Sequence, residues 1–179
     1  AISGPPGAGR STLLRNLKPY AQKWGWETFS GGEWARQFAV NNGKHPAQDT
    51  RHHKATDYSD DIDYQIDTVM REKLSDPAAH YIVESWIGGW NMRELSHVLK
   101  VLLTCSDSLR IDRLVNRDNL TVEEAKKHIQ ERQEANFAKW QRMYGVVDFW
   151  DPKYYDLVID TYSNGPNETL NVVLEKLGN

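Results

Sequence analysis

Short apolar segments alternate with amphipathic segments along the chain. The apolar runs at residues 81–84 and 101–104 have the length and composition of buried strands. Strands that alternate with helices predict a parallel sheet covered by helices on both faces. In the amphipathic segments, apolar side chains recur at the spacing of one helix face: Leu13, Leu14 and Leu17, and later Ile62, Ile66, Val69 and Met70.

The pattern predicts one α/β domain over residues 1–179. Pro19 is expected to bend or end the first helix near Lys18. Thr121 and Glu124 match a capping box and open a long helix that ends near Gly145. Residues 41–61 are the most polar stretch and are interpreted as a flexible connection. The other predicted elements are strands at 1–3, 26–29 and 156–160, and helices at 33–40, 61–74 and 168–177.

Composition excludes several classes of protein. The chain has 179 residues, 39% of them hydrophobic, which is enough for one core of useful size. The net charge of −3 argues against a nucleic-acid binder that works by bulk charge. No apolar run approaches the roughly 20 residues of a membrane helix. The single cysteine, Cys105, agrees with a reducing, cytoplasmic setting, and we expect a monomer or dimer.

The strongest motif is the segment Gly4-Pro5-Pro6-Gly7-Ala8-Gly9-Arg10-Ser11. It fits the phosphate-binding pattern G-x-x-x-x-G-K-[ST], except that Arg10 stands in place of lysine. Glycines let the backbone curl so that N–H groups point at phosphate oxygens, and the helix that follows adds its positive end. The sequence therefore predicts a nucleotide phosphate site, in which the Ser11 hydroxyl ligates Mg²⁺.

Arg10 changes what this loop is expected to do. A planar guanidinium keeps the charge but does not replace a compact ammonium group in a tight loop. We therefore expect nucleotide binding to survive better than the rate of transfer. A catalytically weak site remains one of the interpretations.

The order and spacing of further motifs resemble those of the short, archaeal-type cytidylate kinases, within the nucleoside monophosphate kinases. Residues 30–36 resemble S-x-G-[DE]-x-x-R, residues 61–67 resemble I-D-x-x-I-D, and residues 82–90 resemble V-L-E-G-R-L-A-G-W. The other matching segments are Arg110, Arg113 and Arg117 on R-x-x-R-x-x-x-R, the basic residues Arg132 and Lys139, Y-G-[IV] at 144–146, and Y-D-L-V-I-[ND]-T at 155–161.

The resemblance implies a P-loop kinase fold, with three layers, a parallel sheet in the order 2-3-1-4-5 and a helical lid at residues 118–139. It implies that ATP binds with Mg²⁺ and that residues 41–61 close over the acceptor. Its implied ATP-binding residues are Gly4, Gly7, Ala8, Gly9, Arg10, Ser11, Thr12 and Arg117. Its implied acceptor-binding residues are Arg36, Asp63 and Trp86, with Asp67 one helical turn beyond Asp63.

Phosphoryl transfer requires cations that converge on the moving group. Arg10, Arg132 and Lys139 are the candidate catalytic cations. Glu84 ends an apolar strand, where carboxylates of sheet-based nucleotide enzymes face the ligand. We predict that Glu84 holds a magnesium-bound water or orients the acceptor.

Three functions stay open at this point. The first is ATP- and Mg-dependent transfer to a nucleoside monophosphate, such as CMP or dCMP. The second is a kinase of another small molecule or of a nucleic-acid acceptor, favoured because Trp86 replaces an arginine that contacts the acceptor phosphate in the family. The third is a nucleotide-binding regulator with weak catalysis, favoured by Arg10.

Overall fold

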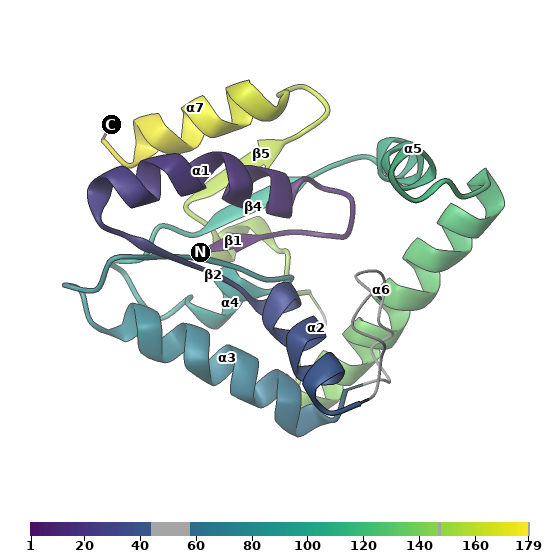
Figure 1. Ribbon diagram of the computed structural model, residues 1–179, viewed down its shortest axis with the longest axis horizontal. Helices are drawn as coiled ribbons and strands as arrows, with labels where there is room; N and C mark the ends of the chain where they lie inside the picture. The colour runs from purple at the N-terminus through teal and green to yellow at the C-terminus, as the bar shows by residue number, and fades with distance from the viewer. Residues whose placement is uncertain (44–57, 147, 179) are drawn as a thin grey trace.

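The computed structural model describes residues 1–43, 58–146 and 148–178. Within them, a five-stranded parallel sheet has the strand order β2-β3-β1-β4-β5 (Figure 1). This is the predicted order 2-3-1-4-5. The strands are β1 (Ile2–Ser3), β2 (Glu27–Ser30), β3 (Tyr81–Glu84), β4 (Val101–Thr104) and β5 (Leu157–Asp160).

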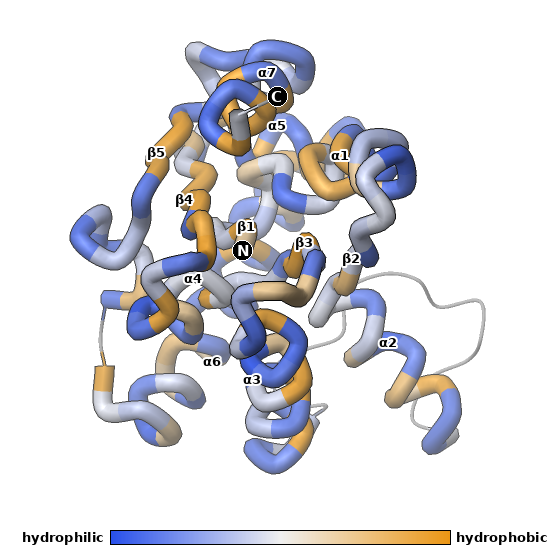
Figure 2. The backbone as a smooth tube through the Cα atoms, turned by 90° about the vertical axis from the view of Figure 1, so that its left-hand side faces the viewer, coloured by the Kyte–Doolittle hydropathy of each residue, from blue (hydrophilic) through white to orange (hydrophobic). Residues whose placement is uncertain are grey.

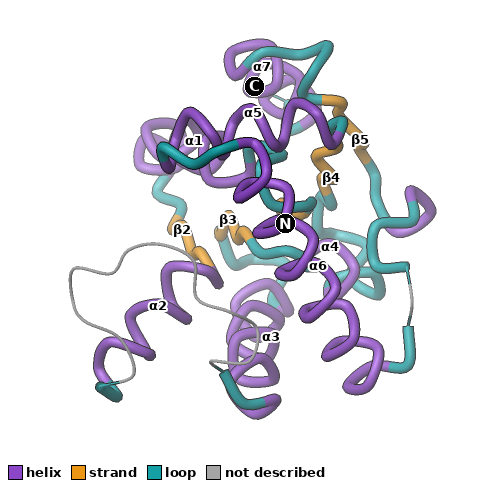
Figure 3. Tube along the Cα trace, turned by 90° about the vertical axis from the view of Figure 1, so that its right-hand side faces the viewer, coloured by secondary structure: helices purple, strands orange, loops and turns teal. Residues whose placement is uncertain are grey.

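Helices cover both faces of this sheet, so the fold has the predicted three layers (Figures 1 and 3). On one face lie α1 (Arg10–Trp24) and α7 (Pro166–Lys176). On the other lie α3 (Asp60–Ser75) and the short α4 (Gly88–Asn91). The remaining elements flank the end of the sheet: α2 (Gly31–Asn41), α5 (Asp107–Asp118), α6 (Val122–Tyr144) and the 3₁₀ turn η2 (Pro152–Tyr154). None of the described helices has the length and hydropathy needed to cross a membrane.

Each covered face of the sheet has its own apolar core, and the backbone coloured by hydropathy in Figure 2 shows apolar segments along the strands. Between the sheet and α1 and α7, the buried side chains include Leu13, Leu17, Val101, Leu103 and Val173. Between the sheet and α3 they include Ile62, Ile66, Met70, Val83 and Met92. The two cores explain why the strands are apolar runs rather than alternating segments.

A third, aromatic cluster joins α4 and α6 to the segment before η2. Phe149 is fully buried at its centre, and Trp90 packs edge-on against it with ring centroids 4.9 Å apart. Trp140 of α6 lies 5.9 Å from Phe149 in the same geometry. This cluster places α6 next to the end of the sheet.

Two of the differences from the predicted helix boundaries have a clear physical cause. Pro19 lies inside α1, which continues to Trp24. Pro19 is exposed, so the carbonyl that loses its N–H partner faces water, while buried Leu17 and Ala21 continue the apolar stripe past it. The second helix begins at Gly31 rather than at residue 33, because the Ser30 side chain accepts a hydrogen bond from the Glu33 N–H.

Other boundaries agree with the prediction. Strands β3 and β4 have the predicted ends, and the capping box of Thr121 and Glu124 opens α6, which ends at Tyr144. Most of the predicted flexible connection, residues 44–57, lies outside the described residues, while Asp60 and Asp61 belong to α3.

One face of α3 is joined to the last turns of α6 by polar side chains. Arg142 forms a bidentate hydrogen bond with Asp60, and Lys139 forms an ion pair with Asp63. The Tyr144 hydroxyl donates a short hydrogen bond to Asp67. Burial raises the pKa of Asp67 to about 7, against the opposing effect of the Tyr144 hydrogen bond. Asp67 therefore titrates near neutral pH in the folded protein.

This pKa predicts a specific pH dependence of stability. An acid whose pKa is raised by folding stabilises the folded state below its unfolded pKa, near 4, and that contribution is lost as the pH rises through about 7. Asp67→Asn keeps the neutral form at every pH. We expect the free energy of unfolding of Asp67→Asn, relative to the wild type, to rise by about 2 kcal/mol between pH 5 and pH 8. Urea unfolding at several pH values measures it.

Asp112→Asn on the exposed face of α5 is the matched control, and its stability difference should stay constant over the same range. Parallel pH profiles for the wild type and Asp67→Asn would contradict the prediction.

Candidate active site

A cavity of about 790 Å³ opens at the carboxyl end of the sheet. The loop between β1 and α1 forms one side of it, and the first turn of α2 with the end of β3 forms another. Side chains of α5 and α6 close the remaining side. Parallel sheets place their ligand sites in this crevice.

Five backbone N–H groups of the loop and the first turn of α1 have no hydrogen-bond partner in the described part of the chain: those of Gly7, Gly9, Arg10, Ser11 and Thr12. Gly7 and Gly9 adopt positive φ values of 82° and 97°, which turn the loop into the start of the helix. Such a set of N–H groups at a helix N-terminus is an anion site.

The carbonyl groups of the same loop are held by side chains from other elements. Those of residues 6, 7 and 8 accept hydrogen bonds from Arg110 Nε at 2.8 Å, Arg113 Nη1 at 2.9 Å and Thr161 Oγ1 at 3.1 Å, respectively. Arg113 also donates to the Thr161 carbonyl at 2.9 Å, which joins α5 to the end of β5. These three side chains hold the loop in place, and they satisfy its carbonyl groups as hydrogen-bond acceptors.

Two of the predicted phosphate-binding residues use their N–H groups within the protein. The Gly4 N–H donates to the Trp86 carbonyl at 3.2 Å, and the Ala8 N–H donates to the Pro5 carbonyl at 3.2 Å. A Cβ atom at Gly4 would lie 2.3 Å from the Leu103 carbonyl oxygen. Glycine is therefore required at position 4 for close packing, and the N–H groups of Gly4 and Ala8 are already used within the protein.

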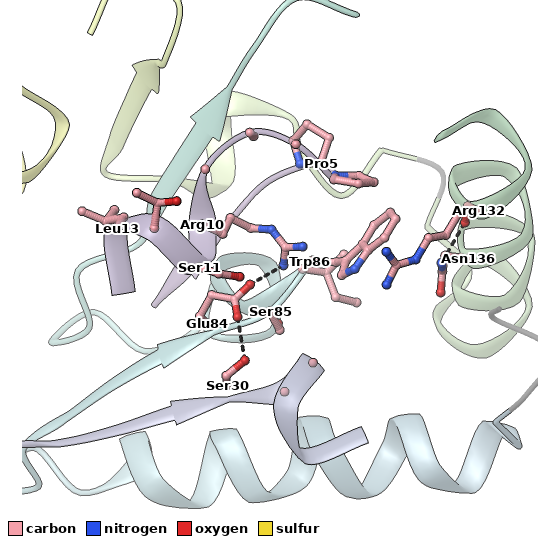
Figure 4. A pocket seen from close by; sticks show the side chains of 18 of the residues that line it. Pro5, Arg10, Ser11, Leu13, Ser30, Glu84, Ser85, Trp86, Arg132 and Asn136 are labelled. Carbon is pink, nitrogen blue, oxygen red and sulfur yellow. Dashed lines mark hydrogen bonds and ion pairs between the residues drawn. The ribbon is translucent and has the colours of Figure 1, made fainter. Parts of the chain in front are cut away.

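Arg10 points from the start of α1 to the end of β3 (Figure 4). Its Nη1 atom lies 2.7 Å from Glu84 Oε1, and Glu84 Oε2 accepts a hydrogen bond from Ser30 Oγ at 2.8 Å. Burial lowers the pKa of Arg10, and Glu84 acts in the opposite direction. Both carboxylate oxygens of Glu84 are thus engaged, and Ser30 links the carboxylate to the N-terminus of α2.

Arg36 and Arg132 line the same cavity from α2 and α6. Within the described ranges, neither has an ion-pair partner. Burial, together with the charges of Arg10 and Arg36, lowers the pKa of Arg132 to about 10. Three guanidinium groups therefore line one cavity. Glu84 pairs with Arg10, and the other carboxylates that line the cavity, those of Asp63, Asp67 and Asp118, contact Lys139, Tyr144 and Arg117, respectively.

Other predicted residues have different surroundings. The Lys139 ammonium group is buried against Asp63 and also donates to the Tyr58 carbonyl at 2.9 Å. Lys139 does not line the cavity, so its placement does not support the predicted catalytic role. Asp63 lines the cavity while paired with Lys139, and Arg117 lines it from the exposed side of α5, where it contacts Asp118.

Trp86 lies two residues before α4 and lines the cavity. Trp140 packs edge-on against it at 5.5 Å, and Trp150 packs nearly parallel to it at 6.3 Å. The predicted contact of Trp86 with an acceptor stays a prediction.

Sequence reasoning assigned no role to Ser30, Arg113 or Thr161, which shape the site. Ser30 is the first residue of the motif at 30–36, and Thr161 is the last residue of the motif at 155–161. Their places in these motifs are the sequence signal that could have identified them. The spacing of Arg110, Arg113 and Arg117 is equally typical of an exposed stripe on a helix surface. Only the fold brings Arg113 to the Gly7 carbonyl.

The described residues fit a magnesium ion that arrives with a nucleotide. No group of three or more Asp, Glu, His or Cys side chains in the described ranges is arranged to hold a metal. The Ser11 hydroxyl, on the first turn of α1, is exposed and has no hydrogen-bond partner there. Mg²⁺ is commonly held by one or two protein ligands together with substrate phosphates and water.

Comparison with known proteins agrees with this geometry. Residues 26–163 match the model of the "Cytidylate kinase-like family". The chain is 34% identical over 173 residues to a cytidylate kinase of Haloarcula marismortui, covering 97% of this chain and 85% of that protein. It is 31% identical over 172 residues to a cytidylate kinase of Thermococcus sibiricus, covering 96% and 83%.

Solved structures agree on the fold. An uncharacterized protein from Eubacterium ventriosum superimposes with a TM-score of 0.70 at 12% identity, covering 99% of this chain and 96% of that one. Shikimate kinase from Acinetobacter baumannii superimposes with a TM-score of 0.54 at 16% identity, covering 98% and 90%. The fold is that of the P-loop kinases, and the chain belongs to the cytidylate kinase-like family, a family of phosphotransferases.

Proposed function

We propose that the protein transfers the γ-phosphoryl group of ATP, in the presence of Mg²⁺, to a nucleoside monophosphate such as CMP or dCMP. The observation that carries the proposal is the meeting of five unpartnered loop N–H groups with three guanidinium groups in one cavity. The family supports the class of reaction, and its curated members named above are cytidylate kinases.

On the donor side, the N–H groups of Gly7, Gly9 and Arg10 bind the β- and γ-phosphates of ATP. Ser11 is the protein ligand of Mg²⁺, which neutralises charge on the phosphates when it is bound. Arg117, exposed at the rim of the cavity, contacts the nucleotide from α5.

On the acceptor side, Arg36 and Arg132 bind the acceptor phosphate. Both line the cavity opposite the loop, and neither is neutralised by a carboxylate of the described residues. Glu84 orients Arg10 through the 2.7 Å ion pair and is itself oriented by Ser30.

The chemical step needs positioning and charge neutralisation rather than a general base. An oxygen of the ionised acceptor phosphate forms a bond to the γ-phosphorus. The bond from that phosphorus to the oxygen bridging to the β-phosphate breaks, and ADP leaves. Arg10 and Arg132 stabilise the charge that spreads over the transferred group.

A coupled assay of ADP formation with CMP, dCMP, UMP, AMP and GMP tests the proposal. We expect acceptor-dependent ADP formation that requires Mg²⁺, because charge recognition at Arg36 and Arg132 favours a monophosphate. We expect it to be fastest with a cytidine nucleotide, because the curated relatives named above are cytidylate kinases. A 5′-hydroxyl oligonucleotide is included as a different acceptor. Transfer to the oligonucleotide alone, or to no acceptor, would contradict the proposal.

A nucleotide-binding regulator is the second candidate, favoured by the engagement of Arg10 with Glu84. Arg10→Lys distinguishes it from an enzyme. We expect Arg10→Lys to raise kcat roughly tenfold, equivalent to about 1.4 kcal/mol, because a compact ammonium group fits between phosphates better than a guanidinium. Calorimetry measures the affinity of the wild type and of Arg10→Lys for ATP. Tight binding without turnover in either form would favour the regulator.

The hydrogen bonds to the loop carbonyls predict a further effect on ATP binding. Arg113→Ala removes charged donors from the Gly7 and Thr161 carbonyls, each worth about 1.5–3 kcal/mol. We expect the Kd for ATP, measured by calorimetry, to rise by at least about tenfold. Arg142→Ala, which removes an exposed arginine outside the cavity, is the control and should leave the Kd unchanged. An unchanged Kd in Arg113→Ala would contradict the prediction.

A further inference from the structure

The indole ring of Trp86 lies between two arginines of the candidate active site (Figure 4). The guanidinium carbon of Arg10 is 5.6 Å from the ring centroid, and that of Arg132 is 5.2 Å from it. Both distances are within the range of cation–π attraction. The two arginines come from α1 and α6, so the ring connects the phosphate loop to the helix on the other side of the cavity.

These arginines repel each other in the absence of an anion. The charge of Arg10 is the largest electrostatic contribution that lowers the pKa of Arg132, and Arg36 acts in the same direction on both. Glu84 pairs with Arg10, but no ion pair with Arg132 is present within the described ranges. Among the described residues, the buried Nε atom of Arg132 has no hydrogen-bond partner. The π face of Trp86 is therefore an attractive contact for the Arg132 charge, and Tyr58 acts on that charge in the same direction.

Trp86 is itself held firmly. Its carbonyl accepts hydrogen bonds from the Gly4 N–H at 3.2 Å and from Trp150 Nε1 at 2.8 Å. Its ring packs against Trp140 and Trp150. The indole is thus fixed both to the phosphate loop and to the aromatic cluster of α6, and it can act as a rigid separator.

We propose that Trp86 is a positioning residue, which holds the guanidinium groups of Arg10 and Arg132 on opposite sides of its ring and directs them to the phosphoryl group in transfer. The inference rests on the proposed function. A π face attracts both cations without adding a charge, whereas an arginine at this position would add a further cation to the cluster. In this chain, the ring at position 86 acts by placing the two guanidinium groups, whereas a cation at position 86 would act through its own charge.

The experiment compares Trp86→Phe, which keeps an aromatic face, with Trp86→Leu, which keeps only apolar bulk. We expect kcat with the best acceptor to fall less than about threefold in Trp86→Phe and roughly tenfold or more in Trp86→Leu. Thermal unfolding of both variants shows whether they fold equally well. Adding Trp86→Leu to an Arg132→Met background should lower kcat by a smaller factor than it does in the wild type, because one of the two arginines that Trp86 holds is already absent.

A second measurement is independent of activity. In protein labelled with ¹⁵N-arginine, the Nε–H signal of Arg132 should show an aromatic ring-current shift, present in Trp86→Phe and lost in Trp86→Leu. Loss of this shift with unchanged kcat would overturn the positioning role, and so would an equal loss of kcat in Trp86→Phe and Trp86→Leu. If the wild type itself transfers to no acceptor, the proposed function fails, and the catalytic role of Trp86 fails with it.

Discussion

The orientation of the peptide groups in the loop between β1 and α1 is the constraint on which the site depends. A peptide loop has donors and acceptors in equal number, and it attracts an anion only when its acceptors are satisfied elsewhere. Here, Arg110, Arg113 and Thr161 satisfy the carbonyls of three successive residues. The loop N–H groups are then left for a ligand. Residues far from the motif in sequence are thus as necessary to it as its glycines.

The parallel sheet and the helices on its two faces bring the residues of the site together. Side chains from β3, α5 and α6, and Thr161 directly after β5, line the same cavity as the loop because all the strands are parallel and end at the same edge. The apolar cores on the two faces hold the strands in that register. The aromatic cluster around Phe149 fixes α6 beside the edge and thereby carries Arg132 into the cavity.

Sequence patterns predicted the elements whose determinants are local. The apolar runs of β3 and β4, the capping box at Thr121 and the glycine-rich turn between β1 and α1 all depend on residues close together in the chain, and the structure agrees with these elements. Pro19 was misjudged because the rule for proline is local, whereas the buried stripe of α1 is a tertiary feature. The catalytic role of Lys139 was predicted from the order of the motifs. Motif order does not reveal that Lys139 on α6 forms an ion pair with Asp63 on α3. The arginines that support the loop could not be told from a surface stripe for the same reason.

The distribution of tryptophan has an optical consequence. Of the seven tryptophans, Trp86, Trp90, Trp140 and Trp150 belong to or border the aromatic cluster beside the cavity. Trp24 and Trp26 pack together at the opposite end of the sheet. Much of the ultraviolet emission of the protein therefore originates next to the site, and the molecule contains its own fluorescent reporter of occupancy.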